Sequence, residues 1–146
     1  MPERIVPYIS VPDAAEAITF YQNAFDAEHI GPTLRDPSGN IIHTEIRVGE
    51  SVIMMADENP DFGNISPNTL GDTPVRFSIE TEDADAVAQQ AIDTGAELVI
   101  PVEDQFYGYR SGRLKDPYGH LWILSQKLED LTEEEMQERC NELFTE

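Results

Sequence analysis

Apolar and polar positions along the chain follow the same succession of patterns twice. In each half, a strand-like apolar run precedes a stretch with apolar residues at helical spacing, and three further strand-like runs follow. We expect strands at residues 5–11, 28–34, 41–48 and 51–57, and again at 75–81, 98–102, 109–114 and 121–125. The two halves therefore predict two modules with the order strand, helix, strand, strand, strand.

Local signals place the helix starts. Asp13 can cap the first helix, and Glu16 follows three positions later, as in a capping box. Asp83 occupies the same place before the second helix, at an offset of about 70 residues that recurs through both halves. Residues 59–73 are rich in Pro, Gly, Asn and Asp and show no apolar period, so we expect a connecting loop there.

The last part of the chain predicts a hairpin and a final helix. Two apolar runs flank the turn Asp116–Gly119, in which Pro presets one dihedral and Gly allows a positive one. After it, Thr132 and Glu135 form a capping box for a helix that reaches about Phe144. Its apolar face should pack on its own domain or on a dimer partner, and consists of Met136, Cys140, Leu143 and Phe144.

The two modules and the closing hairpin together resemble the vicinal oxygen chelate superfamily of glyoxalase, bleomycin-resistance and extradiol dioxygenase proteins. Within it the chain is most similar to the PhnB-like branch, through the segments His43-Thr44-Glu45, Met54–Asp57, Pro101–Gly108 and Leu128–Asp130. The resemblance implies an α+β fold in which two βαβββ modules form curved sheets around a cup. We expect one such domain over residues 1–130, with modules at about 1–58 and 74–127, and a C-terminal helix over 131–146.

In metal-dependent members of the superfamily, His or Glu side chains on the first and last strands of each module hold a divalent ion. Alignment through the two modules puts Val6, Met54, Arg76 and Ile123 at these four places. Val, Ile and Arg do not ligate such cations, and Met is a soft thioether suited to other metals. We therefore expect neither a metal nor another cofactor at the superfamily position.

Strand alternation predicts which side chains line the cup, because residues two apart face the same side. His43, beside Glu45, is the candidate acid or base. A loop bounded by glycine could cover the cup as a lid. The candidate ligand-binding residues are Tyr8, Arg47, Arg76 and Ser78 on strands and Gln105, Tyr107 and Arg110 on or beside that loop. Arginines beside carboxylates could anchor an anionic or polar molecule, but a self-satisfied salt-bridge network explains the same residues equally well.

Other conspicuous side chains have structural interpretations. We expect His120 to serve the hairpin turn or its packing, and His29 to face solvent from a strand. Trp122 should pack in the core with its indole N–H satisfied.

Composition narrows the function classes. The chain has 146 residues, with 29 acidic against 9 basic ones and a net charge of −20, which makes nucleic-acid binding improbable. The scarcity of lysine, found only at Lys115 and Lys127, suggests adaptation to high salt, although an ordinary acidic protein remains the alternative. The lone Cys140, the lack of a signal-like segment and the lack of a long apolar run predict a cytoplasmic protein without a membrane role.

Three functions remain open on the sequence alone. The first is metal-independent binding of a small polar or anionic molecule in the cup, akin to the bleomycin-resistance relatives. The second is a lyase, isomerase or dioxygenase-type enzyme that uses His43 and Glu45 or a metal at an unexpected position. The third is a structural or regulatory dimer. The lost ligands favour the first over the second, and a homodimer is expected by analogy with the superfamily.

Overall fold

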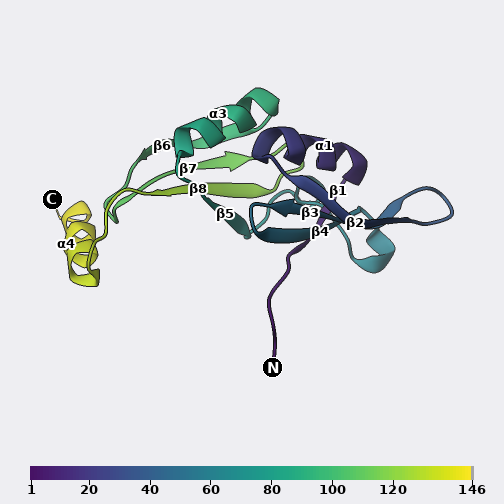
Figure 1. The fold of residues 1–146 in the computed structure, drawn as a ribbon, viewed down its shortest axis with the longest axis horizontal. Coiled ribbons are helices and arrows are strands. Elements are labelled where there is room, and N and C mark those ends of the chain that lie inside the picture. The colour runs from purple at the N-terminus through teal and green to yellow at the C-terminus, as the bar shows by residue number, and fades with distance from the viewer. Residues whose placement is uncertain (146) are drawn as a thin grey trace. The chain divides into compact units, whose positions relative to one another are not determined.

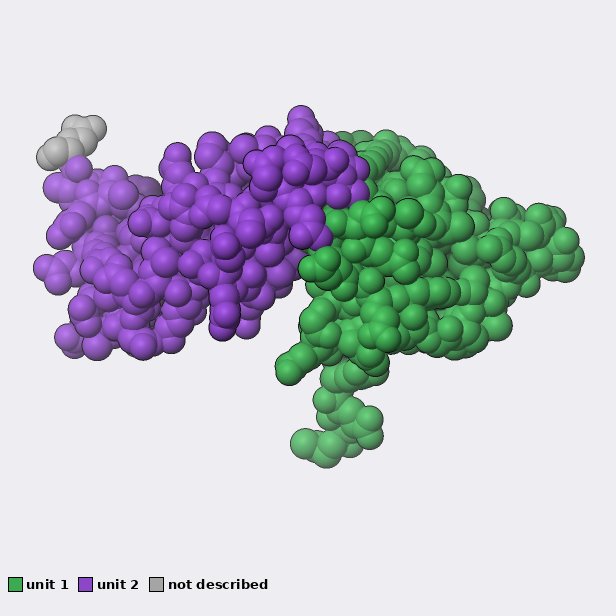
Figure 2. Space-filling model, turned by 45° about the horizontal axis from the view of Figure 1, so that its top comes forward, with its two compact units in different colours: residues 1–74, 117–120 green, residues 75–116, 121–146 purple. Residues whose placement is uncertain are grey.

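A computed structural model describes residues 1–145, and in it the chain divides into two units (Figure 2). Unit 1 contains Met1–Pro74 together with the short segment Pro117–His120. Unit 2 contains Val75–Asp116 and the chain from Leu121 onward.

Unit 1 is a four-stranded sheet with one long helix on a face (Figure 1). Its strands lie in the order β1-β4-β3-β2, with β1 parallel to β4 and the other pairs antiparallel. Its elements are β1 (Tyr8–Val11), α1 (Ala14–Phe25), β2 (Glu28–Arg35), β3 (Ile41–Val48), β4 (Ser51–Asp57), the 3₁₀ turn η1 (Pro60–Phe62) and α2 (Pro67–Leu70).

Unit 2 repeats this arrangement. Its sheet has the order β5-β8-β7-β6, again with the first strand parallel to the last and the other pairs antiparallel. Its elements are β5 (Arg76–Glu80), α3 (Ala84–Thr94), β6 (Glu97–Asp104), β7 (Tyr109–Lys115), β8 (Leu121–Lys127) and α4 (Glu133–Leu143). The α+β fold with two repeated modules and a C-terminal helix is therefore confirmed.

The expected caps hold the two module helices. The Asp13 carboxylate accepts a hydrogen bond of 3.1 Å from the Glu16 amide, and Asp83 accepts one of 3.0 Å from the Ala86 amide. Each cap satisfies a backbone N–H that would otherwise lack a partner in the first helical turn. The same local chemistry thus starts both helices at equivalent places.

The core of unit 1 lies between α1 and its sheet. The predicted apolar stripe of α1 is buried, and the turn segment 117–120 completes the packing. The Tyr118 ring meets the Phe20 ring edge-on at a centroid distance of 5.8 Å. His120 Nε2 lies 2.9 Å from the Ser10 carbonyl oxygen, so this histidine packs the turn, as expected.

The core of unit 2 centres on Trp122, which is 2% exposed. Its indole N–H donates a hydrogen bond of 2.9 Å to the buried Asp116 carboxylate, which confirms the prediction for this residue. Leu114 and Leu124 are fully buried in the same unit, and the buried residues of α3 are Ala84, Ala88 and Ala91.

Two predictions about the elements were wrong, whereas the bounds of the other predicted strands lie within two residues of those observed. β1 begins at Tyr8 and not at residue 5, because Ile5 is almost fully exposed and Pro7 has no N–H to continue the ladder. The expected loop over residues 59–73 contains the helical turns η1 and α2, which begin with Asn59-Pro60 and Ser66-Pro67. A cap residue followed by Pro starts a helical turn without any apolar period.

The C-terminal helix has the predicted start, but its own domain does not bury its apolar face, so packing on a dimer partner stays a prediction. Both hydrogen bonds of the Thr132–Glu135 capping box are present. No residue of α4 is buried, and Leu143 and Phe144 remain 61% and 83% exposed.

None of the helices in residues 1–145 combines the length and apolar character that a membrane crossing requires.

Candidate functional site

The unit 1 sheet has a polar face opposite α1. In the strand register, Met54 lies opposite both Tyr8 on β1 and Glu45 on β3. The intervening residues of these strands, including Ile9 and Ile46, are buried on the α1 side. We call the surface formed by Tyr8, His43, Glu45 and Met54 the polar face of unit 1.

His43 and Glu45 form the central pair of this face. His43 Nε2 lies 3.2 Å from Glu45 Oε2, and their side chains are 26% and 25% exposed. When Nε2 carries the imidazole proton, it donates to Glu45, and Nδ1 remains as an acceptor. Gly31 leaves room for this arrangement, since a Cβ there would lie 2.8 Å from Glu45 Oε2. Sequence reasoning identified the His43–Glu45 pair but missed Gly31. A glycine inside a strand often marks a place where another group approaches the backbone closely, and that signal was present in the sequence.

Arg47, predicted to bind ligand, is engaged with a carboxylate on the neighbouring strand. Its Nη1 lies 3.1 Å from Glu28 Oε2, and both side chains are largely exposed. An exposed pair of this kind contributes little to stability, but it offsets the positive charge that an anionic ligand would need.

Arg110 lies on the other face of the unit 2 sheet from Arg76 and Ser78. Its guanidinium binds Asp85 in the first turn of α3 through bonds of 2.7 and 3.0 Å, and Asp104 through one of 2.9 Å. Hydrogen bonding to Arg110 lowers the pKa of the Asp85 carboxyl and raises the pKa of the guanidinium. This arginine ties α3 to β6 and β7, so we leave it out of the candidate site.

Arg76 and Ser78 occupy the face of the unit 2 sheet opposite α3. They alternate with the more buried Phe77 and Ile79 along β5, as predicted. Ser78 lies opposite Ile123 on β8. Arg76 and Ser78 thus share a face, and Arg110 is not on it.

The predicted lid loop is fastened to the C-terminal part of unit 2. The Gly108 carbonyl oxygen accepts hydrogen bonds from the amides of Leu128 and Glu129, at 2.9 and 3.0 Å. Arg139 of α4 donates to the Phe106 carbonyl oxygen at 3.4 Å and pairs with Glu129. Gln105 binds backbone oxygens within its own hairpin, and the Tyr107 ring packs against Tyr109. These contacts leave the loop little freedom to act as a lid.

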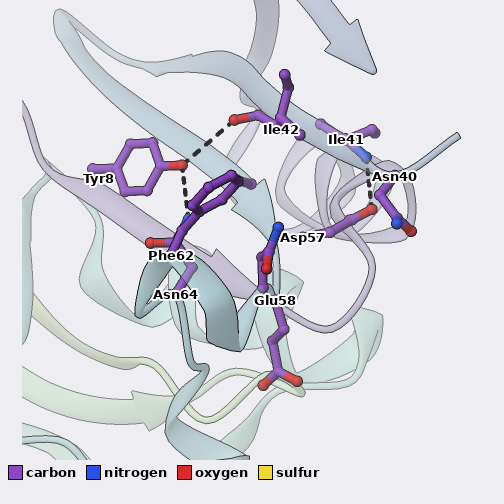
Figure 3. Close-up of a pocket in the computed structure, with 10 residues that line it drawn as sticks. Tyr8, Asn40, Ile41, Ile42, Asp57, Glu58, Phe62 and Asn64 are labelled. Atoms are coloured by element: carbon purple, nitrogen blue, oxygen red, sulfur yellow. Dashed lines mark hydrogen bonds between the residues drawn. The ribbon is translucent and has the colours of Figure 1, made fainter. Parts of the chain in front are cut away.

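A small cavity opens beside the polar face of unit 1, with a volume of about 220 Å³ (Figure 3). Of the predicted site residues, it contains only Tyr8. It is lined by Tyr8, Asn40, Ile41, Ile42, Ala56, Asp57, Glu58, Asn59, Phe62 and Asn64. Sequence reasoning missed it because its walls come from three strands and from a segment expected to be an irregular loop.

Comparison with known proteins gives the family. Residues 4–124 match the model of the glyoxalase/bleomycin resistance protein/dioxygenase superfamily. The chain belongs to this superfamily. An uncharacterized protein of Mycobacterium bovis is 38% identical over 134 residues, which cover 90% of this chain and 88% of that protein.

Solved structures share the superfamily fold. A gene product of Arabidopsis thaliana matches with a TM-score of 0.69 and 26% identity, covering 86% of this chain and all of that one. The PhnB protein of Bacillus cereus matches with a TM-score of 0.63 and 20% identity, covering 85% of this chain and 99% of that one. The predicted resemblance to PhnB-like proteins thus has a counterpart among structures of this fold.

The sequence alignment predicts the superfamily's metal-ligand places at Val6, Met54, Arg76 and Ile123, none of which has an imidazole or carboxylate side chain. The register puts Tyr8 opposite Met54 and Ser78 opposite Ile123, whereas Val6 precedes β1. None of these paired side chains fits a hard or borderline cation: Tyr8 has a phenol, Met54 a thioether, Ser78 a hydroxyl and Ile123 a hydrocarbon chain. Within residues 1–145, no three His, Cys, Asp or Glu side chains lie close enough together to hold a metal.

Proposed function

We propose that the polar face of unit 1 binds a small polar molecule without a metal ion. The observation that carries this proposal is the His43–Glu45 pair, which is half-buried, internally hydrogen-bonded and directed away from the α1 core. Such a pair is costly to hold partly out of water unless its remaining hydrogen-bonding atoms also find partners.

The chemistry of the pair defines the preferred ligand groups. With Nε2 bonded to Glu45, His43 Nδ1 accepts a hydrogen bond, and the second Glu45 oxygen accepts another. Both atoms suit hydroxyl or N–H donors of a ligand. The Tyr8 ring, 43% exposed, adds a flat surface beside them.

Charge favours uncharged or cationic ligands over anionic ones. Arg47, on the strand of His43 and Glu45, is already paired with a carboxylate, and the chain carries a net charge of −20. An anion would have to approach against this field without a cation dedicated to it. This proposal therefore drops the anionic ligands that were expected from the sequence.

The test is an amide NMR screen of the full chain against a library of neutral, cationic and anionic compounds in the presence of a chelator. We expect compounds with hydroxyl or N–H groups to shift the signals of residues 43–45. His43→Gln should weaken the strongest compound about tenfold, the cost of one charge-assisted hydrogen bond. Arg47→Gln is the matched control and should bind normally. A library without any compound that shifts these signals would refute the proposal.

We also propose that two chains associate through β6, the edge strand of the unit 2 sheet. Three consecutive residues of this strand, Leu98, Val99 and Ile100, are 43–50% exposed beside unpaired edge groups. An apolar edge of this kind readily pairs with another strand. Sedimentation should show a dimer that Ile100→Lys dissociates; a monomer at all concentrations would contradict this.

A further inference from the structure

The cavity beside the polar face has a composition of its own. It combines two exposed aromatic rings, three asparagines and two carboxylates that accept hydrogen bonds from the surrounding fold. Figure 3 shows most of these residues. We propose that this cavity is a binding site for a flat, uncharged molecule of one or two rings that carries a carboxamide or a similar donor–acceptor pair.

The rings supply the flat surfaces. Tyr8 and Phe62 border the cavity while they remain 43% and 73% exposed (Figure 3). Phe62 is held outward by η1, which Asn59 caps through a bond of 3.2 Å to the Asp61 amide. Large rings left exposed at the rim of a cavity typically mark a place where another flat group stacks.

The carboxylates of the cavity are committed to the fold. Asp57 accepts from the Ala14 amide at 2.7 Å with one oxygen and from the Ile41 amide at 2.8 Å with the other. Glu58 accepts from Ser66 and Thr69, and these hydrogen bonds lower its pKa. Their charges are thus spread over backbone and hydroxyl donors, which argues against a cation as the occupant.

The asparagines offer both kinds of hydrogen bond. Asn64 donates through Nδ2 to the Tyr8 hydroxyl at 3.2 Å, and Asn40 donates through Nδ2 to Asp36 at the same distance. The carbonyl oxygens of these two side chains, and the Nδ2 of Asn59, make no hydrogen bond within residues 1–145. Two acceptors and a donor complement the N–H₂ and C=O of a carboxamide.

Size and charge limit the occupant further. At about 220 Å³ the cavity is smaller than the roughly 300–1,000 Å³ of pockets that enclose drug-sized molecules. A negative molecule would meet the Asp57 carboxylate at the cavity wall, in a chain with a net charge of −20. Among molecules of equal shape, the neutral amide should therefore bind better than the acid.

The test compares nicotinamide with nicotinate, which has nearly the same shape and carries a negative charge. Amide NMR titration of the full chain should show nicotinamide shifting residues 56–64, with nicotinate at least about fivefold weaker. Phe62→Ala should weaken nicotinamide about fivefold, because one aromatic contact is lost. Leu70→Ala is the control, since Leu70 is an exposed apolar residue of the same segment that does not line the cavity.

Two further variants separate this site from the His43–Glu45 pair. Asn64→Leu keeps the volume, removes the hydrogen-bonding groups and should weaken nicotinamide about fivefold. His43→Gln should leave nicotinamide binding unchanged even where it abolishes binding at the polar face. Absence of nicotinamide binding, equal binding of nicotinate, or shifts confined to residues that do not line the cavity would each overturn the proposal.

Discussion

Glu58 fastens the segment that carries Phe62 to the end of β4. Its carboxylate accepts hydrogen bonds from the Ser66 amide, the Ser66 hydroxyl and the Thr69 hydroxyl at the start of α2. These bonds hold the pKa of Glu58 below its ordinary value of 4.5. The charged form is thus favoured in the folded chain, which ties local stability to pH.

Glu58→Gln should lower the free energy of unfolding by about 1 kcal/mol at neutral pH, as expected for lost hydrogen bonds to a charged acceptor. The folded-state pKa is lowered, so the contribution is complete above pH 4.5 and disappears as the pH falls through the lower folded-state value. Urea unfolding of both proteins from pH 7 down to acid should show the difference shrinking only below pH 4.5. A difference that is constant with pH would contradict this role.

The tail after β8 fixes the loop before β7. Gly108 adopts a φ of +83°, and a Cβ there would lie 3.1 Å from a Leu131 methyl and 3.2 Å from the Glu129 carbonyl oxygen. Both the backbone conformation and the close approach therefore require glycine.

Gly108→Ala should destabilise the chain by about 2 kcal/mol, through left-handed backbone strain and crowding against the tail. Gly49→Ala serves as the control, since Gly49 has a φ of +58° and a Cβ there would have open space for 4 Å around it. The control should lose about 1 kcal/mol, from backbone strain alone. Thermal unfolding measures both, and equal losses would show that the tail does not crowd residue 108.

Periodicity predicted the strands and the long helices, but it missed η1 and α2 and did not predict all of the contacts. Alternation along β3 correctly predicted that His43 and Glu45 share a face. Thr44 and Ile46 are buried on the opposite face, and this fixes which residues of the strand point away from the core. The same alternation along β7 predicts that Arg110 points to the α3 side. Sequence reasoning instead assigned Arg110 to the lid loop, so this prediction was missed. The cavity could not be predicted, because Tyr8 and Asn64 are 56 residues apart and meet only through the fold.

The whole molecule carries its acidic residues mostly at the surface. With 29 acidic and 9 basic residues, repulsion among surface carboxylates opposes the compact state in dilute buffer. The ion pairs of Arg47, Lys127 and Arg139 join exposed or half-exposed groups, which contribute little to stability. Dissolved salt, rather than internal pairing, is therefore the main means of relieving this repulsion.

We expect the melting temperature to rise by several degrees between low salt and about 2 M KCl, because the screening length falls to roughly 3 Å at 1 M. Scanning calorimetry over a KCl series measures this. Sucrose at matched water activity should give a smaller rise, since it does not screen charge. A melting temperature that does not change with KCl would contradict adaptation to high salt.

The central claim is that the polar face of unit 1 binds its ligand without a metal ion. Its most direct test is the affinity of the strongest compound from the library, measured before and after exhaustive chelation, with metal content determined in both samples. The account predicts affinities that agree within about twofold, and far less than one equivalent of metal in either sample. A loss of about tenfold or more on chelation, restored by one equivalent of Mn²⁺, Ni²⁺, Zn²⁺ or Fe²⁺, would contradict it.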